Sequence, residues 1–413
     1  MEYVIKSGDT LSKIALNYSM TWPELYNYDG GTGKTNRTRL NEQKKAKGRP
    51  SKSIDNPDLI YPDDVILVPG EQTTATSAAG DTTNQNPPPT SGSYTRPNYS
   101  VNVGSQKFSL DSGPDVVSIR VVRTMGLPID GCEICLAGGK SYSFAKGDAV
   151  KVQLGYDDNF APVFSGIVDN IEREVSAVKV TALGLAVSLL RLRLNRVYLN
   201  QTAGKIVSNL AQEAKLTVKK ASDGINLPMY VVDEGKNAYE HVLRLAEQCN
   251  FDVYVTEDEA LMFKEWGGGK DHTIEYGKEL IQVEGSDFSP LYLSAKVYGE
   301  SPSSMKGSDT SHWLTKQEVK GEAGTGAVLS LHDPAIKDKK TAETAAKARL
   351  DRMKYTFAVV VEAVGKPEVK LGDTVTLKGL SDSALSGNLE VRGIEHYLNK
   401  TKGFTTRFSC WMR

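Results

Sequence analysis

The spacing of apolar residues changes several times along the chain, and each change predicts a different kind of element. Near the N-terminus, Tyr3-Val4-Ile5 has the length of a short strand, and apolar residues at 11, 14 and 15 open a helix. Trp22-Pro23 starts a second helix, because proline suits the first helical position. Val65 to Pro69 is apolar again and predicts a closing strand. Residues 1–69 are therefore expected to fold as strand, helix, helix, strand.

The segment from Asp29 to about Ser53 interrupts this unit. It is polar and basic and has no apolar period, so we expect an exposed inserted loop. Asn36-Arg37-Thr38-Arg39 is a poor helix start. Gly30 to Thr35 looks like a phosphate-binding loop, but Tyr28 stands where the motif needs its first glycine, and nucleotide binding is not expected.

Residues 70–98 are rich in Thr, Ser, Gly, Asn and Gln and include Pro87-Pro88-Pro89, which is typical of a linker. From about residue 99 the apolar period becomes two. Val117, Ile119 and Val121 alternate with polar residues, and further alternation continues to about residue 190. This pattern predicts a first β-barrel over residues 99–190.

Residues 202–214 and 237–249 return to the helical period. Thr202 is placed to cap the first of these helices, Asn237 with Glu240 forms a capping box for the second, and Asn250 is a stop signal. Phe251 to Val255 and Leu261 to Phe263 predict a hairpin after the second helix. We expect an α/β region over residues 191–290, inserted between two barrels.

The last third predicts the second barrel, over residues 291–413. Its expected elements are a loop over 301–324, an alanine-rich helix from Thr341 to Met353, and strands at 291–298, 357–364, 373–378, 388–397 and 404–411. The predicted fold class is mainly β with α+β parts.

Composition excludes some functions. The 413 residues carry a net charge of −1, which gives no long-range field to attract nucleic acid or an anionic membrane. The one dense basic run, Lys44 to Lys52, leaves a nucleic-acid adaptor as a remote alternative, and nucleic-acid binding is not expected. No apolar stretch is long enough for a membrane-spanning helix. The N-terminus lacks the features of a signal peptide, so we expect synthesis in the bacterial cytoplasm.

The sequence predicts neither catalysis nor a cofactor or metal. The five histidines are scattered and form no known ligand or catalytic pattern. Cys132 and Cys135 have the spacing of a redox or zinc pair, but within a strand they point to opposite faces, so we expect buried small side chains. Acidic pairs fall on turns, where solvated carboxylates are routine.

The N-terminal unit resembles the LysM domain, through Gly8-Asp9-Thr10-Leu11 and through Asn56-Pro57-Asp58 leading by Ile60-Tyr61-Pro62 to Val68-Pro69. The resemblance implies a shallow groove for glycans that contain N-acetylglucosamine. Two other readings stay open: the groove docks a protein, or its residues are only a helix cap and a turn. The implied groove residues are Gly8, Asp9, Thr10, Leu11, Pro57, Asp58, Leu59, Ile60 and Tyr61.

Residues 115–413 resemble the late-control D family of phage baseplate hubs, which includes the hub part of the VgrG spike proteins of type VI secretion. Five phrases carry the resemblance: Val152 through Gly155 and Phe164-Ser165-Gly166 to Glu172; Leu189 to Arg193 leading to Ile206 and Ala211; Tyr239 through Leu243 to Ala246, then Phe251 and Tyr254; Leu371-Gly372-Asp373-Thr374-Val375; and Gly393 to His396 with Gly403-Phe404-Thr405-Thr406.

This resemblance implies a structural protein of a contractile tail-like particle. The implied assembly is a homotrimer whose six barrels form a ring that adapts a hexameric tail tube to a trimeric spike. The spike would be a separate polypeptide, and other baseplate proteins would be partners. The resemblance does not separate a phage tail from a type VI-like or an extracellular injection particle. The alternative is a peptidoglycan-binding LysM protein of the cell wall.

Overall fold

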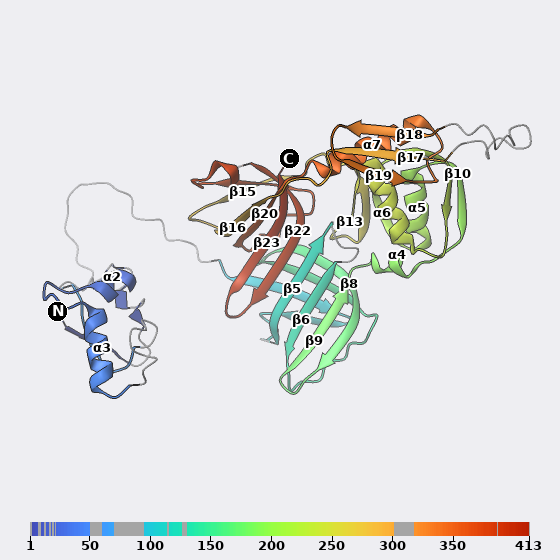
Figure 1. Ribbon diagram of the computed structural model, residues 1–413. Helices are drawn as coiled ribbons and strands as arrows, with labels where there is room; N and C mark the ends of the chain where they lie inside the picture. Colours follow the sequence, from blue (N-terminus) through green and yellow to red (C-terminus); the bar gives the residue numbers. More distant parts are fainter. Residues whose placement is uncertain are drawn as a thin grey trace, which may run out of the picture. The chain divides into compact units, whose positions relative to one another are not determined.

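The computed structural model describes residues 2–6, 10, 11, 14, 15, 18, 20, 22–49, 60–69, 95–113, 115–125, 130–300, 318–385 and 387–412. The chain divides into two compact units, Met1–Gly92 and Ser93–Arg413. Each unit is described by itself (Figure 1). Among the described residues, no helix is long and apolar enough to span a membrane.

The first unit is built on a two-stranded antiparallel sheet of β1 (Glu2–Val4) and β2 (Val65–Leu67), together with the helices α2 (Trp22–Asn27) and α3 (Asn36–Ala46). Residues 11, 14 and 15 are helical, as the apolar spacing predicted. The fully or nearly buried core of this unit comprises Ile5, Leu11, Ile14, Ala15, Tyr18, Leu25, Tyr26, Leu40, Ile66 and Val68.

Helix α3 corrects the prediction of an exposed loop for Asp29 to Ser53. Thr35 caps the helix by accepting a hydrogen bond from the Thr38 amide, so the segment judged a poor helix start does begin one. Leu40 is fully buried in the core. One buried apolar residue leaves almost no periodic signal, which is why the pattern of hydrophobic residues missed this helix.

Polar side chains instead fasten α3 to the sheet. The Asn36 amide nitrogen donates to the Leu67 carbonyl at 2.7 Å, and the Leu67 amide donates to Asn36 Oδ1 at 2.6 Å. Gln43, two turns later, exchanges the same two hydrogen bonds with the backbone of Val65, at 2.7 and 2.8 Å. Among the described residues β2 has β1 as its one strand neighbour, so the two amides satisfy the edge that a third strand would otherwise occupy.

A sheet of thirteen strands dominates the second unit. Its strand order is β16-β20-β23-β22-β5-β6-β9-β8-β7-β3-β4, and β21 pairs with β22 and β15 off this path. The strands are β3 (Pro97–Val103), β4 (Gln106–Ser109), β5 (Val116–Thr124), β6 (Gly131–Ala137), β7 (Ala149–Tyr156), β8 (Asn159–Arg173), β9 (Ala177–Leu183), β15 (Asp271–Glu275), β16 (Leu280–Asp287), β20 (Phe357–Val364), β21 (Thr374–Lys378), β22 (Asn388–Asn399) and β23 (Gly403–Met412).

The large sheet is an internal repeat. We call β3 to β9 the N-terminal half-sheet, and β15, β16 and β20 to β23 the C-terminal half-sheet. The N-terminal order β5-β6-β9-β8-β7-β3 matches the C-terminal order β16-β20-β23-β22-β21-β15. The one difference in direction is that β3 runs antiparallel to β7 whereas β15 runs parallel to β21.

A glycine–aspartate turn marks the repeat in atomic detail. Gly147 and Gly372 have φ values of 90° and 86°, in the region that favours glycine. Each glycine donates its amide to a valine carbonyl of the neighbouring long strand, Val168 at 2.8 Å or Val391 at 2.9 Å, and the same valine donates back to the carbonyl of Asp148 or Asp373.

The two aspartate side chains of the repeat also act alike. Asp148 Oδ2 accepts from the Ala145 amide and Asp373 Oδ2 from the Lys370 amide, both at 2.9 Å. A β-bulge follows each valine partner, in β8 and in β22. The sequence analysis identifies the phrase around Gly372 but not its counterpart in the N-terminal half-sheet, Lys146-Gly147-Asp148.

The half-sheets are joined by antiparallel pairing of β22 with β5, from Gly393 opposite Thr124 to Asn399 opposite Ser118. Each half-sheet has its own apolar core. Leu398 and Phe404, from the C-terminal half-sheet, lie in the core of the N-terminal half-sheet. Val117, expected on the buried face with Ile119, is 41% exposed because a bulge between Val116 and Ser118 shifts the register of β5.

An α/β region lies between the two half-sheets in the sequence. It contains α4 (Val187–Arg191), β10 (Arg196–Thr202), α5 (Ala203–Glu213), β11 (Thr217–Ala221), β12 (Asn226–Val232), α6 (Ala238–Cys249), β13 (Asp252–Val255) and β14 (Ala260–Lys264). The predicted helix signals are confirmed: Thr202 caps α5, Asn237 and Glu240 form the capping box of α6, and Asn250 ends α6 with a left-handed φ of 56°.

Two expected boundaries differ in the structure. Strands β15 and β16, expected in the α/β region of 191–290, pair with C-terminal strands β21 and β20. Within the expected second barrel of 291–413, β17 (Ser294–Tyr298), β18 (Lys320–Gly324) and β19 (Val328–His332) form a separate sheet, which packs with α7 (Lys339–Met353) and through it on α6. The loop expected over 301–324 thus ends in a strand, and residues 301–317 lie outside the described part.

Candidate functional site

The groove that the LysM resemblance implies is described at four of its nine positions. Gly8, Asp9, Pro57, Asp58 and Leu59 lie outside the described residues. Leu11 is 4% exposed, because its side chain belongs to the core. Thr10 is exposed, whereas Ile60 and Tyr61 are half-buried. Of the described four, Thr10, Ile60 and Tyr61 present surface that a ligand can contact.

The basic residues next to this groove take part in the fold. Lys44 is fully buried. Lys47 donates to the Asp63 carbonyl at 2.9 Å and pairs with the buried carboxylate of Asp64 at 2.7 Å. The guanidinium carbon of Arg49 lies 4.3 Å from the centre of the Tyr61 ring, a cation–π contact. These contacts hold the turn before β2. They also engage the positive charges of Lys47 and Arg49, which a nucleic-acid adaptor would need for binding phosphates.

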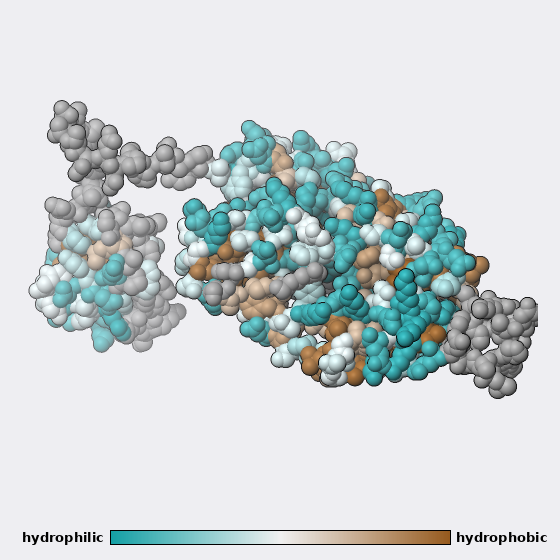
Figure 2. All heavy atoms as spheres, turned by 90° about the horizontal axis from the view of Figure 1, so that it is seen from above, coloured by the Kyte–Doolittle hydropathy of each residue, from teal (hydrophilic) through white to brown (hydrophobic). Residues whose placement is uncertain are grey.

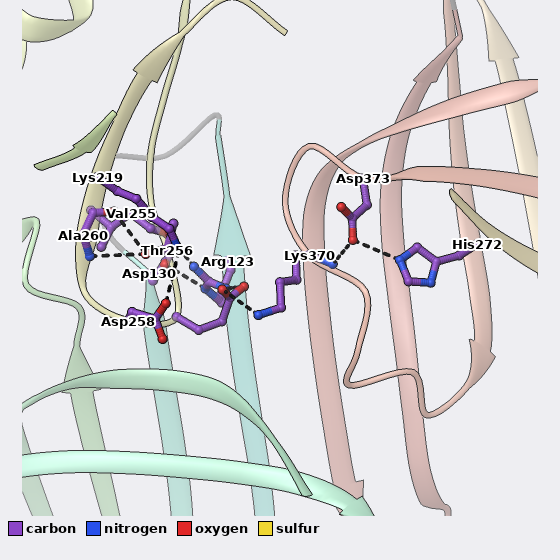
Figure 3. A network of polar contacts seen from close by, with 11 residues as sticks. Arg123, Asp130, Lys219, Val255, Thr256, Asp258, Ala260, His272, Lys370 and Asp373 are labelled. Atoms are coloured by element: carbon purple, nitrogen blue, oxygen red, sulfur yellow. Dashed lines mark hydrogen bonds and ion pairs between the residues drawn. The ribbon is translucent and has the colours of Figure 1, made fainter. Parts of the chain in front are cut away.

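In the second unit, buried ion pairs gather where the two half-sheets and the α/β region meet. We call this meeting place, which includes Arg123, Asp130, Glu257 and Lys370, the joint. Arg123, on β5, is 3% exposed and contacts Asp130 at 2.9 Å and Glu257 at 2.5 Å. Its guanidinium also donates to the Val255 carbonyl. Lys370, which precedes β21, reaches Glu257 from the C-terminal half-sheet at 3.3 Å (Figure 3). Arg123 and Lys370, which both pair with Glu257, therefore link the two half-sheets to the α/β region.

Opposite charges in this cluster offset the cost of burial for Arg123 and Glu257, whereas burial outweighs Arg123 at Asp130 and raises the pKa of that carboxyl. Burial alone disfavours each charged form, but Asp130 and Glu257 outweigh it and raise the pKa of Arg123. Burial likewise opposes ionisation of Glu257, but Arg123 and Lys370 outweigh it and lower the pKa of that carboxyl. Paired charges with saturated hydrogen bonds are suited to fixing a geometry.

Asp373 lies in the phrase Leu371-Gly372-Asp373-Thr374-Val375, which carries part of the family resemblance, and it extends the same joint. It is 8% exposed. Its carboxylate accepts from the Lys370 amide and contacts His272 Nε2 at 3.0 Å (Figure 3). It also accepts from the Lys270 amide at 2.9 Å. These contacts fix the start of β15 beside β21, so the phrase encodes a turn and a strand junction.

Each bulge of the repeat directs a charged residue to the α/β region. Arg392, in the β22 bulge, pairs with Asp252 of β13 at 2.8 Å and lies 4.4 Å from the centre of the Trp411 ring. In the β8 bulge, Asp169 lies 3.6 Å from Arg191 of α4. The repeat thus places one polar contact to the α/β region on each half-sheet.

Two histidines and two cysteines that the sequence analysis considered for chemistry are packed within the fold. His241 and His396 are buried; their Nδ1 atoms lie 3.1 Å from the Tyr230 hydroxyl and 2.9 Å from the Thr406 hydroxyl. Cys132 is buried whereas Cys135 is half-buried on the opposite face of β6, as predicted. Burial raises the pKa of both thiols. Among the described residues, no three His, Cys, Asp or Glu side chains are grouped to hold a metal.

The chain matches a known family near its N-terminus and is similar to solved structures over most of its length. Residues 3–28 match the LysM domain family. No curated protein sequence matches the chain. A 43 kDa tail protein of prophage MuSo2 from Shewanella oneidensis has a similar structure, with a TM-score of 0.59 at 13% identity, over 76% of this chain and 98% of that chain.

A tail protein from Neisseria meningitidis MC58 is similar to the same degree, with a TM-score of 0.58 at 12% identity, over 77% of this chain and 97% of that chain. The chain has a tail-protein fold. The E. coli c3393 protein, described as a component of the type VI secretion system similar to T4 tail proteins gp27 and gp5, matches with a TM-score of 0.50 at 10% identity, over 75% of this chain and 76% of that one. Tail-protein fold and LysM domain therefore occur together here.

Proposed function

We propose that this protein is a structural hub of the baseplate in a contractile tail-like particle or injection system. The internal repeat carries the proposal: one chain presents two half-sheets with the same strand order and the same Gly–Asp turn. Three such chains around a threefold axis offer six similar sheets. A ring of this kind matches a hexameric tail tube on one side and a trimeric spike on the other. The tail-protein fold supports this role.

The buried contacts of the joint are suited to keeping the two half-sheets in a fixed arrangement under mechanical load. A hub that adapts two symmetries must hold its two sheets at a fixed angle while the tail contracts. The β5–β22 pairing and the Arg123 cluster connect the half-sheets through backbone and charge at once. We infer a structural role without catalysis, with a tail tube protein, a separate spike protein and other baseplate proteins as partners.

Labelling of intact particles tests the assignment. Antibody against the second unit, visualised with gold on particles from the native bacterium, is expected at one end of each particle, where tube and spike meet. Label along the whole tube, or particles that carry no label although the protein is present in the lysate, would contradict the proposal.

A second candidate function rests on the LysM match over residues 3–28. We propose that the first unit can bind peptidoglycan, through a groove that includes Thr10, Ile60 and Tyr61. Purified chain should then sediment with insoluble peptidoglycan and be released by soluble N-acetylglucosamine oligomers. Retention on baseplate proteins, with no sedimentation on peptidoglycan, would assign the groove to protein docking instead.

A further inference from the structure

Several strand edges of the second unit have a partner on one side only among its described residues, and two of them, β16 and the distal part of β8, correspond to the strands of the β22–β5 junction. Apart from an isolated bridge between Leu280 and Tyr276, strand β16 pairs with β20 on one side only. The distal part of β8, from Asn170 to Arg173, pairs with β9 on one side, and its pairing with β7 ends at Ile167. Unpaired edges of this kind expose backbone donors and acceptors, and proteins normally cover or pair them.

The repeat relates these two edges to strands that are paired. Strand order and bulges make β16 the counterpart of β5, and β8 the counterpart of β22. Within the chain, the distal part of β22 pairs antiparallel with β5 and joins the half-sheets. The two strands that would form the same junction a second time, distal β8 and β16, have no partner on that side within the described part of the chain.

We propose that the distal part of β8 in one copy pairs antiparallel with β16 of the next copy, repeating the β22–β5 junction between chains. The inference rests on the proposed function, because a closed ring of three copies uses every such edge once. The six junctions of the ring would then alternate between pairings within and between chains.

The repeat also predicts the register between the chains. Ile394 faces Arg123 and Glu395 faces Val122 in the junction within the chain. The counterparts of these four residues are Ile171, Asp287, Glu172 and Ser286, as the pairing of each half-sheet with its neighbouring strands shows. Glu172 should therefore lie opposite Ser286 of the neighbouring copy, and Arg173 opposite Gly285.

Exposed apolar residues lie at both ends of the proposed contact. Phe288, which follows β16, is 47% exposed and would face Asn170. At the other end, Val175 at the tip of the β8–β9 hairpin is 98% exposed and would come near Ile281, which is 52% exposed. Figure 2 shows a surface on which apolar residues form small separate patches within a mainly polar face. Burial of these side chains would add to the backbone pairing.

Charge limits the length of the pairing. One step beyond Arg173, Glu174 would face Glu284, and two acidic residues opposite each other destabilise a strand pair. The intermolecular ladder should therefore stop at about four pairs, and it is shorter than the ladder between β22 and β5. A short ladder suits a contact that forms on assembly.

Paired cysteines test the register. A chain carrying both Glu172→Cys and Ser286→Cys should, on mild oxidation, give linked dimers and trimers, no larger species, and a single band after reduction. Each single variant is a control for the native cysteines. Lys107→Cys combined with Ser286→Cys is the matched control for exposure, because Lys107 lies on β4, away from the proposed contact.

The outcomes separate this inference from the proposed function. A trimeric mass without linkage of residues 172 and 286 overturns the strand pairing and leaves the hub assignment standing. A monomeric mass at every concentration overturns both. As a second readout that needs no substitution, amide hydrogen exchange within 170–173 and 281–287 should slow on trimer formation; unchanged exchange in a trimer counts against the pairing.

Discussion

The side-chain amide of Asn36 takes the place of a strand neighbour for Leu67. Its oxygen accepts from the Leu67 amide and its nitrogen donates to the Leu67 carbonyl, while the same nitrogen reaches the Leu25 carbonyl at 2.8 Å. Asn36 is fully buried. One residue of the segment predicted to be a loop therefore satisfies three backbone groups of the LysM unit.

Replacing this amide should loosen the first unit. Asn36→Leu leaves the three backbone groups without partners, and each buried unsatisfied group costs about 1–3 kcal/mol. We expect rapid hydrogen exchange of the β2 amides in the full-length chain, measured by mass spectrometry. Glu42→Gln is the control on the same helix, because it removes only the exposed ion pair with Lys34 and should leave β2 protected. Equal exchange in both variants would refute the role of Asn36.

Among the charged residues of the joint, substitution of Arg123 should lower the free energy of unfolding the most. Arg123→Met leaves the buried Asp130 without Arg123 and leaves Glu257 with Lys370 as its cation, and breaking a buried pair of this kind typically costs about 3–5 kcal/mol. Urea unfolding of the second unit, followed by tryptophan fluorescence, measures the loss. Arg120→Met, three residues earlier on β5, breaks a pair with Glu395 in which the arginine is 51% exposed, and should cost less than about 1 kcal/mol. Similar losses for both variants would contradict the account.

The Gly–Asp turns of the repeat should respond alike to substitution. Gly147→Ala and Gly372→Ala force a side chain into a left-handed backbone, at a cost of about 1–2 kcal/mol each. A new Cβ has room at both sites: no atom lies within 4 Å at Gly147, and at Gly372 the closest lies at 3.4 Å. Backbone conformation should thus dominate.

Gly131→Ala supplies the comparison for these two variants. A Cβ there also meets nothing within 4 Å, and its φ is not positive. Thermal unfolding should show nearly unchanged stability for Gly131→Ala and a similar loss for the other two. A clear loss at only one of the two turns would argue against their equivalence.

Acid should destabilise the C-terminal half-sheet through His396. Burial lowers the pKa of His396 to about 3, against about 6.5 in an unfolded chain. Between these values the unfolded chain binds a proton that the folded chain does not, so stability falls as pH decreases, by up to about 1.4 kcal/mol per pH unit. Urea midpoints from pH 7 to pH 4 should fall less steeply in His396→Asn. His332→Asn, at an exposed position, should behave like the unchanged protein, and an unaltered slope in His396→Asn would exclude this source.

Sequence patterns predicted the elements whose apolar spacing is regular. Strand β20 was placed at its observed ends, Phe357 and Val364, and α5 and α6 were placed with their caps, because packing and capping both leave local signals. Helix α3 was missed because Asn36 and Gln43 anchor it through hydrogen bonds, which produce no hydrophobic period. The bulge that exposes Val117 could not be predicted either, because an alternation of period two assumes a regular strand without a register shift.

The joint between the half-sheets could not be predicted from the sequence. Arg123 and Glu257 are 134 residues apart, and nothing local marks either as buried. One signal was available: Gly147-Asp148 and Gly372-Asp373 precede strands of the same kind, and their comparison would have aligned the two half-sheets. The groove residues of the LysM unit stay a prediction.

The mass of the native protein tests the central claim most directly. If the two half-sheets of each chain form a closed ring, mass photometry of the purified full-length protein should give three times the chain mass of 45.0 kDa, and class averages of the same sample should show a ring with six similar lobes. A stable monomer, or an assembly whose lobes do not number six, would contradict the account.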